Sequence, residues 1–233
     1  MERSRTDLRI RAALAAVGVT AALAAAPAAQ AAPADSAASA PAAVAAPPAP
    51  CTGDFKGDKR LGPQYLPRKS QPPVRPLLTG YHRTGKLSSD AFLKKYWEGP
   101  ADTGSWKYPP NDGFAEVNGT VDKAPELLAE GERLDRFGSE YGSYLAPAGD
   151  AYAKRALPPQ NLNTRDAAFP CDYHLYKVTK SFVVWAGSIA PWFEQPGGGR
   201  QIKLDPAFLD PGTGQRLNVL WLIDNGYLAR VTP

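Results

Sequence analysis

The stretch from Tyr173 to Trp185, with the sequence YHLYKVTKSFVVW, decides the fold class of this chain. Residues 173–178 and 182–185 are rich in aromatic and β-branched side chains, which are typical of strands. Residues 201–204 form a further short strand candidate, which follows the glycine turn at 197–199. The chain shows no alternation of long helices with buried strands, and a doubly wound parallel sheet is therefore disfavoured.

The segments on either side of this stretch predict a few short helices. Near the C-terminus, Asn218 is placed to cap a helix over 219–223, which Gly226 would stop before a last strand at 227–231. Upstream, the cap residues at 88–90 precede an apolar stripe at helical spacing, formed by Phe92, Leu93, Tyr96 and Trp97. We therefore expect an α+β domain with a mostly antiparallel β-sheet core, few short helices and an N-terminal wrapping region.

The first residues have the features of an export signal. Four arginines within residues 3–11 precede an apolar run over 12–26, and Ala29-Gln30-Ala31 supplies the small residues of a cleavage site. The run of 15 residues is shorter than the roughly 20 that a membrane-spanning helix needs. We predict a signal peptide over residues 1–31, a disordered Ala/Pro-rich leader over 32–50, and a secreted, extracellular product with no membrane segment after cleavage.

The folded part begins near Cys51 and has the length and charge of one ordinary domain. Removing 50 of the 233 residues leaves 183, with 23 basic and 20 acidic side chains. No basic stripe is present, so nucleic acid is not an expected partner, whereas a small anion needs only one or two arginines. The wrapping region is predicted to span 51–127, and the remaining domain 128–233.

The cysteines and histidines argue against a metal centre. Cys51 and Cys171 are predicted to form one disulfide, as in exported proteins, and with only two histidines in the chain no metal site is expected. A Ca²⁺ site built from the scattered acidic residues Asp205, Asp210 and Asp224 is a weaker alternative. The chain also lacks a dinucleotide-binding glycine fingerprint, a P-loop, a zinc-protease motif and a nucleophile elbow.

Two segments combine a long polar side chain with aromatic residues and glycines. The first is LDRFGSEYGSYLAP at 134–147, and the second is APWFEQPGGGRQ at 190–201. Taken alone, Arg136 would be a surface cation or the partner of Asp135, and the glycines a hairpin loop. Spacing alone therefore favours a structural role for both segments.

As a set, however, these segments resemble the tuberculosis necrotizing toxin (TNT) domain, as do RALPP at 155–159 and WLIDNGYL at 221–228. The resemblance covers roughly residues 128–231, and the upstream stretch is similar to secreted fungal and bacterial members. It implies hydrolysis of NAD⁺, and of NADP⁺ in some members, to nicotinamide and ADP-ribose or its phosphate. NAD⁺ is then the substrate and no cofactor is needed, and an immunity protein is kept as a candidate partner.

The resemblance also implies the site residues. The family's essential arginine and glutamine fall on Arg136 and Gln201, and an aromatic position falls on Tyr144. One toxin branch uses a histidine, for which His174 is the nearby candidate. Five further residues of the two segments are candidates for contact with the substrate: Phe137, Trp192 and Phe193 for stacking, and Gly198 and Gly199 for phosphate.

Nicotinamide leaves NAD⁺ as a neutral molecule, so the reaction does not require the general acid of ordinary glycosidases. Two alternatives remain open at this point. An ADP-ribosyltransferase would break the same bond at the same site but pass ADP-ribose to another acceptor, and Glu194 would be its nearest acidic residue. A non-catalytic secreted binding module would release no nicotinamide.

Overall fold

The computed structural model describes residues 46–68 and 71–232. The predicted signal peptide and all but the end of the predicted leader lie outside the described residues. Within the described part, no helix has both the length and the apolar character that crossing a membrane requires.

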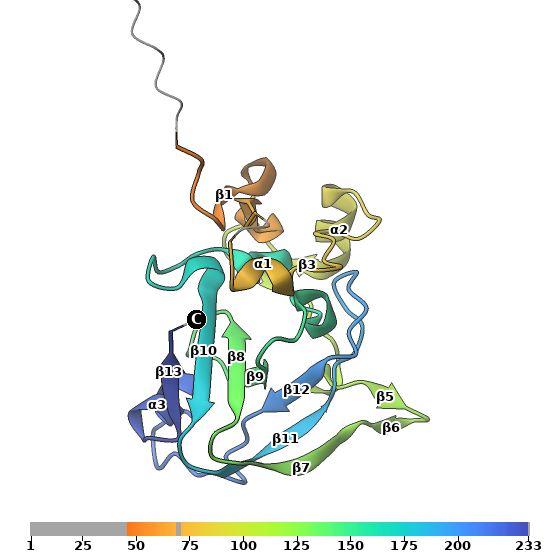
Figure 1. The fold of residues 1–233 in the computed structure, drawn as a ribbon. Helices are drawn as coiled ribbons and strands as arrows, with labels where there is room; N and C mark the ends of the chain where they lie inside the picture. The colour runs from red at the N-terminus through yellow and green to blue at the C-terminus, as the bar shows by residue number, and fades with distance from the viewer. Residues whose placement is uncertain (1–45, 69–70, 233) are drawn as a thin grey trace, which may run out of the picture. The chain divides into compact units, whose positions relative to one another are not determined.

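An antiparallel sheet of seven strands forms the centre of the fold (Figure 1). The strands lie in the order β13-β10-β8-β9-β12-β11-β7, so several neighbours in the sheet are far apart in sequence. Their bounds are β7 (Lys123–Leu128), β8 (Arg133–Phe137), β9 (Tyr144–Pro147), β10 (Tyr173–Val178), β11 (Phe182–Ser188), β12 (Arg200–Lys203) and β13 (Leu228–Val231).

The other elements are short. Three two-stranded ribbons join β1 (Thr52–Asp54) to β2 (Pro63–Tyr65), β3 (Trp97–Glu98) to β4 (Ser105–Trp106), and β5 (Glu116–Val117) to β6 (Thr120–Val121). The α-helices are α1 (Val74–Leu77), α2 (Ser89–Tyr96) and α3 (Val219–Asp224). Single 3₁₀ turns cover Phe55–Gly57, Lys59–Leu61, Asn111–Gly113, Tyr152–Arg155, Pro159–Leu162 and Pro170–Asp172. The predicted α+β class with a mostly antiparallel sheet is confirmed.

Local sequence signals predicted several of these elements. The strand predicted at 173–178 is β10, and the one at 182–185 is extended by three residues to Ser188 in β11. The side chains of Ser88 and Asn218 accept the backbone N–H of Ala91 and Trp221, which caps α2 and α3 as predicted. The strands β7, β8 and β9 were not predicted, and β7 crosses the predicted boundary between residues 127 and 128.

The main core lies between the sheet and α3. It is formed by inward-facing residues of the strands together with Leu217, Val219 and Leu222. Two further clusters join the upstream region to the later chain. In one, Val74 and Leu77 of α1 pack with the cluster that holds Phe137 and Tyr152. In the other, α2 contributes Phe92 and Tyr96 to a cluster with Phe193, so residues upstream of the sheet share their cores with it.

The predicted disulfide between Cys51 and Cys171 is present, with Cα atoms 4.9 Å apart. It joins the first strand of the folded part to the turn that leads into β10. Both cysteines are buried within the cluster around Phe137 and Tyr152. The bond therefore ties the upstream region to the segment that enters the sheet at β10.

Replacing both Cys51 and Cys171 with serine is expected to lower the free energy of unfolding by about 2–4 kcal/mol, because the bond closes a loop with a sequence separation of 120. Denaturant unfolding followed by tryptophan fluorescence measures this loss. The oxidised protein treated with a reductant should show the same midpoint as the double variant. Equal stability of the oxidised protein and the double variant would contradict the expectation.

Candidate active site

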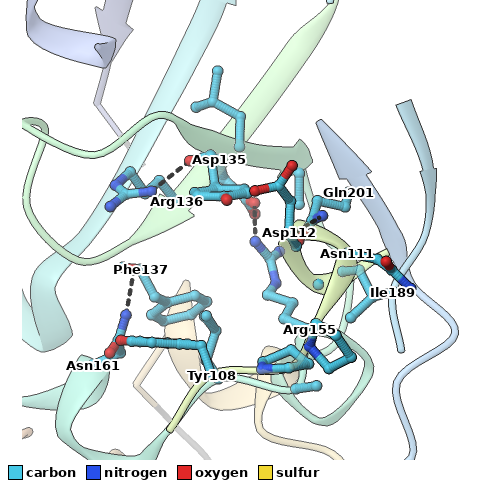
Figure 2. A pocket seen from close by; sticks show the side chains of 18 residues that line it. Tyr108, Asn111, Asp112, Asp135, Arg136, Phe137, Arg155, Asn161, Ile189 and Gln201 are labelled. Atoms are coloured by element: carbon cyan, nitrogen blue, oxygen red, sulfur yellow. Dashed lines mark hydrogen bonds and ion pairs between the residues drawn. The ribbon is translucent and has the colours of Figure 1, made fainter. Parts of the chain in front are cut away.

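A cavity of about 530 Å³ opens where the centre of the sheet meets the upstream chain. The strands β8, β9 and β12 form one side, and the segment from Tyr108 to Gly113 forms another (Figure 2). Four of the residues predicted for the site line this one cavity: Arg136, Phe137, Tyr144 and Gln201. Arg136 and Gln201, which are far apart along the chain, therefore share one hollow.

Arg136 lies near the end of β8 and is fixed by the loop that follows it. Its Nε donates to the carbonyl of Ser139 (2.8 Å) and its Nη1 to the carbonyl of Tyr144 (2.5 Å). Burial lowers the pKa of the guanidinium, but an arginine remains protonated at neutral pH. None of the ion pairs between described residues includes Arg136, so its charge is held in place without being paired to a carboxylate.

Gly142 sets how closely the chain can pass the Arg136 guanidinium. A Cβ atom built on Gly142 would lie within van der Waals overlap of Nη2, Cζ and Nη1 of Arg136. The carbonyls of Ser139 and Tyr144 thus hold the guanidinium. The lack of a side chain at Gly142 leaves the space that it occupies.

Asp135 does not pair with Arg136, in contrast to the structural interpretation of the sequence. Successive residues of a strand point to opposite faces, and Asp135 instead pairs with Arg155 at 2.5 Å. Both side chains are buried, and Asp135 also accepts from Tyr173 Oη (3.0 Å) and the backbone N–H of Gly149 (3.0 Å). The same pair lines the cavity, as Figure 2 shows, so sequence reasoning missed a second arginine there.

Gln201 and Tyr144 lie on neighbouring strands. β12 pairs with β9 so that Lys203 is opposite Tyr144, and Gln201 precedes Lys203 by two residues on the same face. The Gln201 Nε2 donates to the backbone carbonyl of Asp112 at 2.9 Å. Burial, together with the nearby Asp112 carboxylate, raises the pKa of the Tyr144 phenol, which therefore stays protonated at neutral pH.

The predicted aromatic residues lie in two different parts of the structure. Phe137 borders the cavity but is almost fully buried, and its ring packs against Tyr152 and Tyr173. Trp192 and Phe193 do not line the cavity; Phe193 lies in the cluster with α2, where its ring meets Tyr108 edge-on at 5.7 Å. Because Tyr108 lines the cavity, Phe193 packs behind that part of the cavity wall.

Gly198 and Gly199 line a separate, more open hollow of about 510 Å³. The N–H of Gly198 donates to the carbonyl of Ile189 (2.8 Å) and that of Gly199 to the carbonyl of Lys154 (3.0 Å). Neither N–H is left free for a phosphate. The structure therefore does not bring these two glycines to the cavity that holds Arg136.

His174 lies behind the site rather than in it. It is opposite Arg136 in the pairing of β10 with β8, and its buried ring lies between Asp172 Oδ1 (3.3 Å) and Glu140 Oε1 (3.5 Å). It is not among the residues that line the cavity. The histidine therefore belongs to the polar layer next to the Arg136 strand.

The acidic residues considered for Ca²⁺ have other partners. Asp205 accepts from the indole of Trp185 and the N–H of Ala207, and Asp210 accepts from the N–H of Gly212. In residues 46–68 and 71–232, no three His, Cys, Asp or Glu side chains are grouped as a metal site requires.

This arrangement suits an anionic substrate with hydroxyl groups. A fixed guanidinium supplies charge, and the amide of Gln201 and the phenol of Tyr144 supply directional hydrogen bonds. No cysteine thiol is free in the described chain, and the histidine nearest the site lies outside the cavity. The site is thus equipped to bind and orient such a substrate.

Comparison with known proteins agrees with this picture. The family model described as tuberculosis necrotizing toxin matches residues 127–231. The chain is 46% identical over 195 residues to the conidial surface nicotinamide adenine dinucleotide glycohydrolase nadA of Aspergillus fumigatus, which covers 79% of this chain and 76% of that protein.

Solved structures show weaker similarity. The structure of tuberculosis necrotizing toxin with its immunity factor matches 61% of this chain and 71% of that chain, with a TM-score of 0.46 and 24% identity. Rhs1-CT in complex with its cognate immunity protein matches 51% of this chain and 85% of that chain, with a TM-score of 0.30 and 12% identity.

Proposed function

The chain belongs to the tuberculosis necrotizing toxin family and is an NAD glycohydrolase, and from that premise we propose that the cavity bordered by Arg136 and Gln201 is its active site. The observation that carries the proposal is that both residues are among those lining one hollow of about 530 Å³, a size typical of small-molecule sites.

The reaction needs little acid–base chemistry from the protein. The bond between C1′ of ribose and N1 of the nicotinamide ring breaks, and its electron pair neutralises the pyridinium, so nicotinamide leaves uncharged. A water oxygen then bonds to C1′, and its proton is released to solvent. The protein must hold the dinucleotide and stabilise a ribosyl centre with oxocarbenium character.

Arg136 and Gln201 have separate roles in this proposal. The guanidinium of Arg136, held by two carbonyls, offers its remaining N–H groups to a pyrophosphate or ribose oxygen. The Gln201 amide, held by Asp112, is oriented toward a ribose hydroxyl or the attacking water. Tyr144 adds a protonated hydroxyl beside them.

Incubation of the purified chain with NAD⁺ alone tests the reaction. Chromatography should show nicotinamide and free ADP-ribose in equal amounts, with no protein acceptor added. ADP-ribose attached to protein in place of free ADP-ribose would instead indicate a transferase. A parallel incubation with NADP⁺ asks whether ADP-ribose phosphate is also formed, as the resemblance implies.

The proposal also covers where the chain acts and which protein it binds. The relative from Aspergillus fumigatus is described as a conidial surface protein, and the disulfide between Cys51 and Cys171 suits an oxidising compartment. We therefore propose that this chain acts at the cell surface or outside the cell. Binding to an immunity protein stays a prediction from the family resemblance.

Replacing Gln201 with alanine is expected to lower kcat roughly 10- to 100-fold, which corresponds to the loss of one hydrogen bond made in the transition state. Initial rates of nicotinamide release measure the loss. Gln215→Ala is the matched control, because Gln215 is an exposed glutamine whose side chain accepts only from the Trp221 indole in the described structure. Near-normal turnover by Gln201→Ala would place the active site elsewhere.

A further inference from the structure

Three consecutive residues of the upstream region adopt a left-handed backbone at the edge of the cavity. Asn111, Asp112 and Gly113 have φ angles of 55°, 56° and 87°. Such angles are uncommon for residues other than glycine, and they persist only where the surrounding structure holds them. The segment is anchored by the N–H of Ala190, which donates to the carbonyl of Gly113 at 2.9 Å.

Asp112 of this anchored segment makes two contacts with β12. The backbone carbonyl of Asp112 accepts from Gln201 Nε2 at 2.9 Å, and its Oδ2 pairs with Lys203 Nζ at 2.7 Å. Gln201 and Lys203 are two residues apart on β12 and therefore point to the same face. Figure 2 shows Asn111, Asp112 and Gln201 close together at this edge of the cavity.

A carbonyl oxygen can accept a hydrogen bond but cannot donate one, so its partner must be the NH₂ end of the amide. This assigns the orientation of Gln201. Its Oε1 then points away from the Asp112 carbonyl, and no described residue donates a hydrogen bond to it. We propose that Asp112 is a positioning residue, which fixes the Gln201 amide so that Oε1 serves the reaction as a hydrogen-bond acceptor.

The inference rests on the proposed function, because it requires Gln201 to act in the reaction. It adds that the upstream region, beyond packing on the sheet, completes the active site. The model of the family matches only residues 127–231, and Asp112 lies outside that match. Partial burial opposes the charge on Lys203, but the Asp112 carboxylate outweighs it and raises the pKa of the ammonium, so the tether is intact at neutral pH.

Gly113→Ala tests the position of the amide directly. A Cβ atom at Gly113 would lie 3.1 Å from Gln201 Oε1, and this variant is expected to lower kcat about 10- to 100-fold with KM changed less than about twofold. The matched control is Gly119→Ala. Gly119 also has a positive φ of 75°, but a Cβ atom there meets nothing within 4 Å.

Both glycines have a positive φ, so both variants should lose thermal stability. Only the variant next to Gln201 should lose kcat. Equal kcat values for Gly113→Ala and Gly119→Ala, when Gln201→Ala is inactive, would overturn the positioning role while leaving the active site in place. If Gln201→Ala is itself active, the proposed site fails instead.

Lys203→Met tests the tether, because it removes the charge that holds Asp112 and keeps an apolar stem. A loss of about 3- to 5-fold in kcat is expected, as for a partly exposed ion pair. Lys95→Met is the matched control, since Lys95 also pairs with a carboxylate at 2.7 Å, that of Glu194, outside the cavity. Full activity of Lys203→Met would show that the Asp112 side chain does not hold the segment.

Asp112→Asn and Asp112→Ala separate the side chain from the backbone. Asparagine tolerates a left-handed φ and can accept from Lys203, whereas alanine does neither well. Activity should therefore fall less in Asp112→Asn than in Asp112→Ala. The reverse order would contradict a role that depends on holding this backbone conformation.

Discussion

Replacing Arg136 with alanine is expected to lower kcat/KM for NAD⁺ by roughly 10²- to 10³-fold, the loss typical of a fixed donor that stabilises charge in a transition state. The side chain is held by the carbonyls of Ser139 and Tyr144, and none of the ion pairs between described residues includes it. Circular dichroism should remain unchanged, because the backbone bonds of β8 to its neighbours do not involve this side chain.

Arg133→Ala is the matched control for Arg136→Ala. Arg133 lies three residues earlier on the same strand, where its side chain is exposed. It should keep wild-type kinetics. Loss of activity in both variants would indicate damage to β8 as a whole rather than loss of the guanidinium at position 136.

Two further variants test whether activity requires the geometry of the Arg136 guanidinium or only its charge. Arg136→Lys should remain strongly impaired, because an ammonium cannot reproduce a planar fork that bonds two carbonyls and a substrate oxygen together. Gly142→Ala leaves the arginine in place but puts a Cβ atom where its guanidinium lies. We expect a large loss of kcat/KM with a small change in thermal stability, and normal kinetics in both variants would leave charge alone as the requirement.

The sequence predicted best the elements whose signals are local. The cap at Ser88, the cap at Asn218 and the aromatic strand β10 each depend on residues within one turn or one strand. β8 and β9 were missed as strands, because their residues include charged and small side chains with glycines nearby. The sheet order, with β12 between β9 and β11, depends on long-range pairing that no local pattern encodes.

The residues of the candidate site also include some that the sequence predicted and some that it did not. Arg136, Tyr144 and Gln201 were predicted from family resemblance, since each one alone resembles an ordinary surface residue. The segment from Tyr108 to Gly113 has no periodicity, so nothing in its sequence indicated that it forms a wall of the cavity. Trp192 and Phe193 were predicted to contact the substrate, but they pack in the core cluster with α2, as aromatic side chains more often do, and do not line this cavity.

Asp135, the residue before Arg136, is expected to affect the stability of the fold, whereas Arg136 is expected to affect activity. Asp135→Asn is expected to lower the free energy of unfolding by about 3–5 kcal/mol, since it leaves the buried Arg155 guanidinium without its counter-charge. An amide also cannot accept at both oxygen positions, which now receive bonds from Arg155, Tyr173 and the N–H of Gly149. Guanidinium chloride unfolding at neutral pH measures the loss.

Asp58→Asn is the control for this loss of stability, because Asp58 also pairs with Arg60 at 2.5 Å but remains partly exposed. It should lose no more than about 1 kcal/mol. A double-mutant cycle then isolates the buried pair: Asp135→Asn and Arg155→Met should each be costly, and their combination should cost at least about 2 kcal/mol less than the sum. Additive losses would mean that the two charges do not stabilise each other, and that the destabilisation comes from the hydrogen bonds of Tyr173 and Gly149 instead.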